Sequence, residues 1–358
     1  MSIIARMLTK MIFTRFLLIL VGLSLFVIML DTLRNMDSIL ADDSTPYTEL
    51  FRYALLRFPQ VTSTFWTLSL LLAVLLALTE LGWRNETVIF WAAGLSPLGL
   101  AVMLLPLGII LGIAQFIITD HAVPLAAKQL REWGVGDYSR KKTRIGENDP
   151  IWMRAGNDIV RAGKTNSGLS RIDGLTIFRR DKDGLLIEQI IARTAEKTNG
   201  RWLLHDVLIY PRESVPAKRL DSMIYSGTLR FAAVGMRSGD PEEMSLNDLG
   251  YFIDNSGFGI RPVFVYQAWW HKRLSLLITA WLMIAVIIPL SARFRRGGAI
   301  GYMFGIGVAI GFAYFIFDDI SMTIGEMGLA PPMMAAWIPV LVLALAAASL
   351  MLKSETVA

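Results

Sequence analysis

The residue types that most often carry chemistry are few and scattered in this chain. It contains no cysteine, which excludes thiol catalysis, disulfides and thiolate metal sites. Its three histidines, His121, His205 and His271, are far apart and lack the spacing of metal ligands. We predict that they lie at a surface or a membrane boundary, and we assign neither a metal site nor a catalytic residue.

One short sequence imitates a nucleotide-binding loop. Gly163-Lys164-Thr165 has the ending of a P-loop, but Asp158 stands five positions before Gly163, where that loop requires glycine. The nearest glycine is Gly156, and the stretch is rich in hairpin signals. We therefore predict that no nucleotide binds here.

Two arginines follow long apolar segments and could contact an anionic lipid. A guanidinium suits bidentate contact with phosphate, and Arg34 and Arg131 both occupy such positions. An equally good interpretation is that they are interfacial anchors or partners of Asp31 and Asp37.

The composition indicates a membrane protein. Of the 358 residues, 54% are apolar and the mean hydropathy is +0.50, whereas soluble proteins contain about 45–50% apolar residues. The excess is concentrated in roughly the first 120 and the last 85 residues, and the middle resembles a soluble domain. The net charge of +5 is small and dispersed, so it does not indicate nucleic-acid binding.

Six segments are long and apolar enough to cross about 30 Å of hydrocarbon. They are residues 12–30, 61–82, 97–118, 274–292, 299–317 and 333–352. The first has an apolar run too long for a signal peptide and no cleavage motif after it, so we expect a retained helix. We predict spans 1–3 within residues 1–120, a β domain within 121–270, and spans 4–6 within 271–358.

The basic residues predict the orientation. One set of termini and short loops carries most of them, and we place that set in the cytoplasm: Arg6, Lys10, Arg15, Arg84, Arg293, Arg295, Arg296 and Lys353. Both termini are then cytoplasmic, and residues 121–270 lie outside the cytoplasm. Asp318, Asp319 and Glu326 surround the last outer loop, where we expect them to cap helix ends rather than relay protons.

Between residues 149 and 231 the pattern changes to short runs of alternating polarity. One run shows a period of two in its apolar residues, for example Trp202, Leu204, Leu208 and Tyr210. Asp-Gly at 183–184 and Asn-Gly at 199–200 are typical of hairpin turns. We predict an antiparallel sandwich or jelly-roll rather than a Rossmann unit.

The loop between the second and third spans contains a short apolar and aromatic helix. It begins near Glu86 and stops at Gly94, before Pro97. Such a helix could enter a groove on a soluble partner, where Glu86 would meet a basic residue. The residues assigned to this contact are Arg84, Glu86, Val88, Ile89, Phe90, Trp91 and Gly94. The alternative is a helix that rests on the membrane surface.

The fifth span contains two small-xxx-small pairs, Gly301 with Gly305 and Gly307 with Gly311. At about 100° per residue the two pairs lie on different sides of the helix. We predict close packing both within the bundle and against a second subunit. The alternative is that these glycines reflect only how common glycine is in membrane helices.

Together these segments resemble the lipopolysaccharide export permeases, the LptF/LptG family, along essentially the whole chain. Three stretches carry the resemblance: Leu8-Thr9-Lys10-Met11-Ile12-Phe13, then Asn85-Glu86-Thr87-Val88-Ile89 through Ala93-Gly94-Leu95-Ser96, and Gly328-Leu329-Ala330-Pro331-Pro332 with Trp337-Ile338-Pro339. Leu30-Asp31-Thr32-Leu33-Arg34 is more similar to the LptG branch. Arg34 and Arg131 match basic positions that the family associates with substrate, and we add Tyr314 as a candidate lipid contact.

The resemblance implies an α-helical polytopic membrane protein, with three plus three helices and an inserted periplasmic, antiparallel, jelly-roll-like β domain. It implies a multi-pass protein of the inner membrane of a Gram-negative bacterium. The implied partners are a paralogous LptF-type permease, a cytoplasmic LptB-type ATPase dimer that binds ATP and Mg, a single-span LptC-type protein and an LptA-type periplasmic bridge. The chain itself would be a transport subunit without catalytic activity or a cofactor of its own.

Three hypotheses about function remain open at this stage. In the first, the chain is the permease subunit of an ABC-type exporter that extracts lipopolysaccharide from the inner membrane and passes it to the bridge. In the second, the ATPase moves the outer domain mechanically and no lipid passes. In the third, the chain is a membrane-anchored scaffold without energy coupling.

Overall fold

The computed structural model describes residues 3–40, 46–84, 86, 95–138, 151–165, 171–182, 184–198, 201–212, 216–227, 240–254, 261–293 and 300–355. The chain forms two compact units. The membrane unit comprises Met1–Ser139, Pro241–Leu246 and Phe264–Ala358, and the β unit comprises Arg140–Asp240 and Asn247–Val263.

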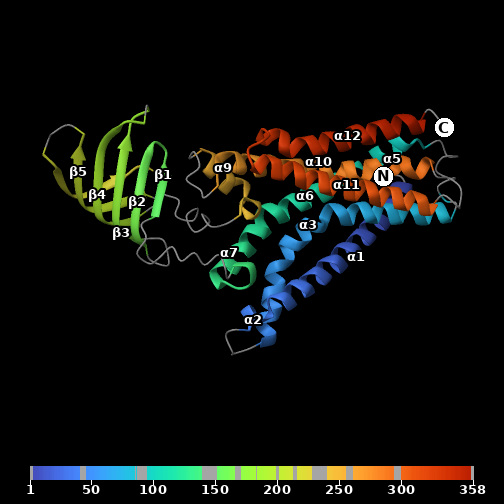
Figure 1. Ribbon diagram of the computed structural model, residues 1–358, viewed down its shortest axis with the longest axis horizontal. Coiled ribbons are helices and arrows are strands. Elements are labelled where there is room, and N and C mark those ends of the chain that lie inside the picture. Colours follow the sequence, from blue (N-terminus) through green and yellow to red (C-terminus); the bar gives the residue numbers. More distant parts are fainter. Residues whose placement is uncertain are drawn as a thin grey trace. The chain divides into compact units, whose positions relative to one another are not determined.

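Long helices make up most of the membrane unit (Figure 1). They are α1 (Ile3–Arg34), α2 (Met36–Ile39), α3 (Pro46–Trp83), α5 (Pro97–Met103), α6 (Leu105–Ile117), α7 (Val123–Trp133), α10 (Val263–Arg293), α11 (Ile300–Glu326) and α12 (Pro332–Glu355). A π-helical turn, Ile118–Ala122, joins α6 to α7. Within the described ranges, six helices are long and apolar enough to span a membrane, which confirms the six predicted spans.

Several helices extend beyond the predicted spans. The third continues through α7 to Trp133, the fourth begins at Val263, and the fifth reaches Glu326. Helical residues therefore occupy both ends of the range 121–270 that we assigned to the β domain. Hydropathy did not indicate α7 because that helix is amphipathic and carries Lys128, Arg131 and Glu132.

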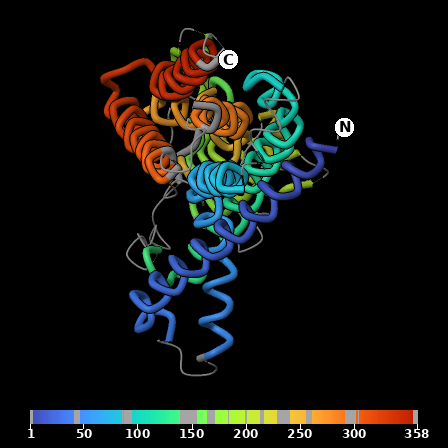
Figure 2. The backbone as a smooth tube through the Cα atoms, turned by 90° about the vertical axis from the view of Figure 1, so that its right-hand side faces the viewer, coloured from blue at the N-terminus to red at the C-terminus, as the bar shows by residue number. Residues whose placement is uncertain are grey.

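The pairing of α1 with α3 follows from a stripe on α1. Its buried residues recur every three or four positions, which places them on one face of a helix: Ala5, Leu8, Ile12, Phe16, Leu20, Ser24 and Ile28. The two helices run side by side (Figures 1 and 2). Phe16 meets Trp66 of α3 edge to face, with ring centroids 5.0 Å apart. The opposite face of α1 is apolar and exposed, as expected for a helix in lipid.

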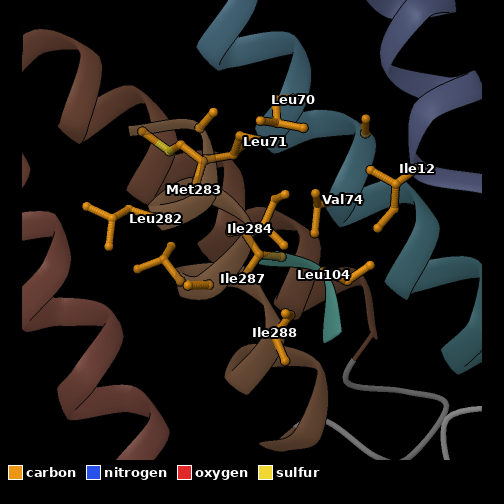
Figure 3. Packing of buried hydrophobic residues seen from close by; sticks show 14 of the residues in the cluster. Ile12, Leu70, Leu71, Val74, Leu104, Leu282, Met283, Ile284, Ile287 and Ile288 are labelled. Carbon is orange, nitrogen blue, oxygen red and sulfur yellow. The ribbon is translucent and has the colours of Figure 1, made fainter. Parts of the chain in front are cut away.

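The core of the membrane unit lies around α10. Ala280 and every residue from Leu282 to Ile288 are buried, so this helix is covered on all sides. Figure 3 shows Met283, Ile284 and Ile287 beside Leu71 and Val74 of α3. Because α10 is enclosed, charged residues at its outer end must find partners within the protein.

Two glycines of α6 bring its backbone against α10. A Cβ added at Gly108 would lie 2.7 Å from the Trp281 Cβ, and one added at Gly112 would lie 2.6 Å from the Leu277 carbonyl oxygen. These glycines form a small-xxx-small pair that the sequence analysis did not single out. The spacing of the two glycines can be read from the sequence, but the sequence does not indicate that α10 packs against them.

The β unit contains one six-stranded antiparallel sheet in the order β1-β2-β3-β4-β5-β6. The strands are β1 (Ile151–Ala155), β2 (Asp158–Thr165), β3 (Arg171–Arg180), β4 (Leu186–Thr198), β5 (Arg201–Pro211) and β6 (Lys218–Tyr225). The inserted antiparallel domain is confirmed, and among the described strands the order is that of a meander. β3 pairs with β4 around residues 183–184, and Thr198 pairs with Arg201 across residues 199–200, as the two hairpin signals predicted.

A crease crosses this sheet at one level. Each strand from β2 to β6 has one residue that is missing from the pairing register, although the residues before and after it are paired. These five residues lie opposite one another across the sheet: Gly163, Gly174, Arg193, Asp206 and Asp221. Gly174 has φ +77 and Asp206 has φ +52. The buried positions of β5 are Trp202 and Leu204 before the crease and Val207 after it.

The crease changes which residues of β5 face the core. Uninterrupted alternation from Trp202 and Leu204 would place Leu208 and Tyr210 on the core face. Instead, Val207 is buried and Tyr210 is 44% exposed. The alternation reverses at Asp206, the residue of β5 at the crease, which has φ +52, whereas the pairing register continues across it.

Candidate functional site

The predicted partner-binding segment is described only at its start. Arg84 is exposed and pairs with Glu80 at 2.6 Å, one helical turn earlier in α3. Glu86 is helical and half-buried. Val88, Ile89, Phe90, Trp91 and Gly94 lie outside the described residues, so their role stays a prediction.

The three predicted lipid contacts differ in availability. Arg34 is exposed in the last turn of α1, and within the described residues no ion pair or hydrogen bond is found for it. Tyr314 of α11 lines a cavity inside the membrane unit. Arg131 is only 12% exposed, and its guanidinium donates to Glu243 at 2.6 Å. The Arg131 guanidinium is therefore already paired with a carboxylate of the same chain.

The cavity beside Tyr314 has a volume of about 390 Å³ and lies among α3, α6, α10 and α11. This is within the roughly 300–1,000 Å³ of ordinary ligand pockets. Its wall combines hydroxyl and amide groups of α3 and α6 with aromatic residues of α10 and α11. The Gln115 amide oxygen, in a side chain only 3% exposed, makes no hydrogen bond within the described residues. The cavity therefore has an unsatisfied acceptor in a wall that is mostly apolar and carries scattered polar groups.

Charged pairs connect helices at the cavity. The Lys272 ammonium group lies 2.5 Å from Asp318, and this pair joins α10 to α11. The indole of Trp269 donates to Glu326 at 2.6 Å. We expected Asp318 and Glu326 to cap helix ends, but Asp318 lies inside α11 because that helix runs to Glu326. The expectation failed because the predicted span ended at residue 317.

A second cluster fastens residues Pro241–Leu246, which we call the return segment. There the chain re-enters the membrane unit from the β unit. Glu243 is 5% exposed and accepts from Arg131 at 2.6 Å and from the Tyr138 hydroxyl at 2.6 Å. Burial and the adjacent Glu243 raise the pKa of Tyr138 well above its ordinary value. Tyr138 therefore stays a neutral donor near pH 7.

Arg273 of α10 provides a second attachment for the return segment. Its side chain is 1% exposed, and its guanidinium donates to the carbonyl oxygens of Glu242 at 2.5 Å and Met244 at 2.7 Å. It also donates to the Thr119 carbonyl at 2.6 Å in the π-helical turn. A charge buried in this way is stable only when its hydrogen bonds are made.

The π-helical turn supplies a third attachment. Asp120 is 7% exposed, and its carboxylate accepts the backbone N–H of Leu246 at 2.6 Å. The return segment is thus held from α7, from α10 and from the turn between α6 and α7. Tyr138 is the last described residue before residues 140–240 of the β unit, and the return segment follows those residues. Residues of this cluster therefore lie on both sides of residues 140–240 in the sequence.

The same cluster reaches α3 and α1. Gln60 of α3 accepts from Arg57 at 2.7 Å and lies 3.5 Å from both Glu243 and the Tyr138 hydroxyl. Arg57 also pairs with Asp31 of α1 at 2.7 Å. Polar contacts therefore run from α1 through α3 to the return segment.

Sequence reasoning missed Glu243, Tyr138 and Arg273. The one available signal was Arg273, a charge beside an apolar segment without an obvious partner. Its acceptors are backbone carbonyls, which no residue-type pattern reveals.

The four glycines of α11 face different surroundings. A Cβ at Gly307 would lie 2.3 Å from Leu75, and one at Gly311 would lie 2.7 Å from Leu71, so this pair packs on α3. A Cβ added at Gly301 or Gly305 would meet no atom of the described residues within 4 Å. Gly307 and Gly311 therefore pack within the bundle, and the surface at Gly301 and Gly305 is open among the described residues.

The described residues contain no group of three or more His, Asp or Glu side chains suited to a metal. Gly163-Lys164-Thr165 ends β2 and is therefore a strand rather than a phosphate-binding loop. The features available for function are the segment after α3, the cavity and the fastened return segment.

Comparisons with known proteins point in one direction. The model of the family described as "Lipopolysaccharide export system permease LptF/LptG" matches residues 6–353. The lipopolysaccharide export system permease protein LptG of Escherichia coli K12 is 23% identical over 301 residues, covering 80% of this chain and 81% of the relative. The protein of the same name from Haemophilus influenzae is 21% identical over 270 residues, covering 74% and 75%.

Proposed function

Because the chain belongs to the lipopolysaccharide export permease family LptF/LptG and is LptG-like, we propose that it is the transmembrane permease subunit of an ABC-type exporter. It extracts lipopolysaccharide from the inner membrane and passes it to a periplasmic bridge. The chain is a transport subunit, and ATP hydrolysis, with its Mg, takes place in a separate cytoplasmic ATPase.

The energetics of lipid movement support this role. Each methylene of an acyl chain gains about 0.8 kcal/mol from burial, so exposing several chains to water would cost tens of kcal/mol. A lipid must therefore pass from one sheltered surface to another. The exposed apolar face of α1 and the cavity beside Tyr314 are surfaces of that kind.

The observation that carries the proposal is the continuity of α3. This helix of 38 residues ends at Trp83, beside the segment proposed to contact the ATPase. Within the same helix, Arg57 and Gln60 flank Pro59, well before Trp83, and they contact the cluster around the return segment. At 1.5 Å per residue the part of α3 from Gln60 to Trp83 is about 35 Å long. A displacement at Arg84 and Glu86 is thus carried to the point where the β unit is attached.

The assembly follows from the family. We propose an LptF-type paralogue, an LptB-type ATPase dimer, an LptC-type single-span partner and an LptA-type bridge. The chain is a multi-pass protein of the inner membrane; both termini are cytoplasmic and the β unit is periplasmic in this proposal. The open surface of Gly301 and Gly305 is the candidate contact with the paralogue.

Among the three predicted lipid contacts, Arg34 and Tyr314 are the stronger. Arg34 has no internal partner within the described residues, and Tyr314 lines the cavity. Arg131 already has a carboxylate, so we assign it primarily to the return segment.

Photocrosslinking tests whether lipid passes. A crosslinking amino acid at Arg34 or Tyr314 should give lipopolysaccharide adducts in the assembled, ATP-hydrolysing complex. The same amino acid at Leu352, an exposed apolar position of α12, is the control and should give none. Active complexes without adducts at Arg34 and Tyr314 would contradict lipid passage and favour the mechanical alternative.

Charge reversal tests the coupling. Glu86→Lys should leave the protein folded and the ATPase bound, but should separate ATP hydrolysis from lipid release. Glu132→Lys, an exposed charge reversal on α7, is the matched control and should release lipid normally. Normal release by Glu86→Lys would remove Glu86 from the mechanism.

A further inference from the structure

A groove between α1 and α3 lies beside the end of α3, next to the segment assigned to the ATPase contact. It has a volume of about 690 Å³, and its wall is mostly apolar. Leu18, Ile19 and Leu76 line its length. Such a groove has the chemistry to accept an acyl chain.

The polar end of the groove is basic. Arg15 of α1 and Arg84 at the end of α3 both pair with Glu80. One carboxylate therefore faces two guanidinium groups, which leaves a net charge of +1. Among the described residues that line the groove, the charge at this end is therefore not balanced.

Unsatisfied polar atoms lie at the same place. The Arg15 Nη1 is buried and makes no hydrogen bond within the described residues, and neither does the Thr79 hydroxyl. A buried donor without an acceptor is costly, so an additional acceptor would be favourable here. Trp83, which is 73% exposed, adds an aromatic ring of the kind that lies at the headgroup level.

We propose that this groove is a binding site for an anionic phospholipid, with the lipid phosphate between Arg15 and Arg84 and an acyl chain along Leu18 and Leu76. Guanidinium groups bind phosphate with paired donors, and basic pockets between membrane helices bind anionic headgroups. Apolar wall and basic end together select a lipid rather than a free anion. This resident lipid is distinct from exported cargo, and the site does not depend on the proposed export function.

The location gives the site a consequence. Of the residues that line it, Glu80 and Trp83 belong to the last turn of α3 and Arg84 follows directly, at the start of the segment assigned to the ATPase. A phosphate shared by Arg15 and Arg84 would fasten that turn to α1. Membranes rich in anionic lipid should therefore hold the end of α3 in place.

The test measures thermal unfolding of the full chain in mild detergent with added lipid. Phosphatidylglycerol should raise the unfolding temperature saturably, whereas phosphatidylcholine with the same acyl chains should not. Glycerol phosphate, which supplies the phosphate without the chains, should act only at far higher concentration. Equal effects of the two lipids, or of the lipid and glycerol phosphate, would overturn the proposal.

Arg84→Gln decides the role of the basic pair, because Arg84 is 64% exposed and its replacement does not endanger folding. It should weaken phosphatidylglycerol binding about tenfold, which corresponds to about 1.4 kcal/mol. The affinity of Arg84→Lys for phosphatidylglycerol should lie between those of the wild type and Arg84→Gln, since lysine keeps the charge and loses the paired donors. Arg193→Gln breaks a comparable exposed pair in the β unit and should bind as the wild type does. Undiminished preference for phosphatidylglycerol in Arg84→Gln would refute the assignment.

Discussion

The buried carboxylate of Glu243 is the most informative single group to remove. Glu243→Leu keeps the site filled but leaves two donors without an acceptor: the Arg131 guanidinium, 12% exposed, and the Tyr138 hydroxyl, in a residue 4% exposed. Removing one partner of a buried ion pair costs about 3–5 kcal/mol, because the other charge stays buried and unpaired. We therefore expect Glu243→Leu to lower the free energy of unfolding by about 3–5 kcal/mol.

The double variant separates the interaction from the loss of a side chain. With Arg131→Met added, neither charge of this pair remains buried, and an apolar replacement of both partners is often neutral or stabilising. The Tyr138 hydroxyl alone stays unpaired, which costs about 1–3 kcal/mol. The double variant should thus be more stable than Glu243→Leu alone. Adding Tyr138→Phe should bring stability close to that of the wild type.

Equilibrium unfolding in mixed micelles with increasing dodecyl sulfate, followed by tryptophan fluorescence, measures these differences. Glu243→Gln is a useful intermediate, since it keeps an acceptor and removes only the charge. The reasoning would be refuted if Glu243→Leu unfolded within about 0.5 kcal/mol of the wild type, the range of ordinary surface substitutions. It would also be refuted if the two substitutions were additive, that is, if Arg131→Met destabilised the Glu243→Leu variant as much as it destabilises the wild type.

Three further substitutions test other parts of the structure. Gly112→Ala should lower stability by about 1–3 kcal/mol in the same unfolding assay, because its Cβ meets the α10 backbone, whereas Gly22→Ala has free space and should be neutral. Because the pKa of Tyr138 is raised in the folded protein, folding favours its protonated form. The free energy of unfolding should therefore fall as the pH rises above about 10, the pKa of tyrosine in the unfolded chain. Tyr138→Phe should reduce that loss of stability at alkaline pH, and an unchanged dependence of stability on pH would contradict the role of Tyr138. Lys272→Leu should destabilise the protein by leaving Asp318 unpaired, and Asp318→Leu in the same chain should restore much of the stability; equal instability of single and double variants would exclude the pair.

The sequence predicted the features that depend on composition over many residues. Six apolar segments and the alternating pattern between them required only the hydrophobic effect and chain geometry, so the spans and the inserted antiparallel sheet are confirmed. The hairpins at 183–184 and 199–200 followed from local turn chemistry.

What the sequence could not predict depends on pairs of residues far apart in the chain. Glu243 and Arg131 are separated by 112 positions, and the acceptors of Arg273 are backbone atoms. Neither relation leaves a periodic signal. Arg131 was therefore interpreted as a lipid contact, although its nearest anion lies within the same chain. The length of α11, and with it the position of Asp318, was underestimated because polar residues near a helix end resemble a loop.

The crease in the β unit constrains how this domain can change. Since every strand from β2 to β6 skips one pairing at the same level, apolar side chains stay on one side of the sheet before and after the bend. Deleting Asp206 alone would leave β5 one residue short opposite Arg193 of β4 and Asp221 of β6, so the pairing on one side of the crease would have to shift. Length changes in these strands are therefore tolerated only at the hairpin tips, or together in neighbouring strands, so that the domain can drift in side-chain identity but not in strand length.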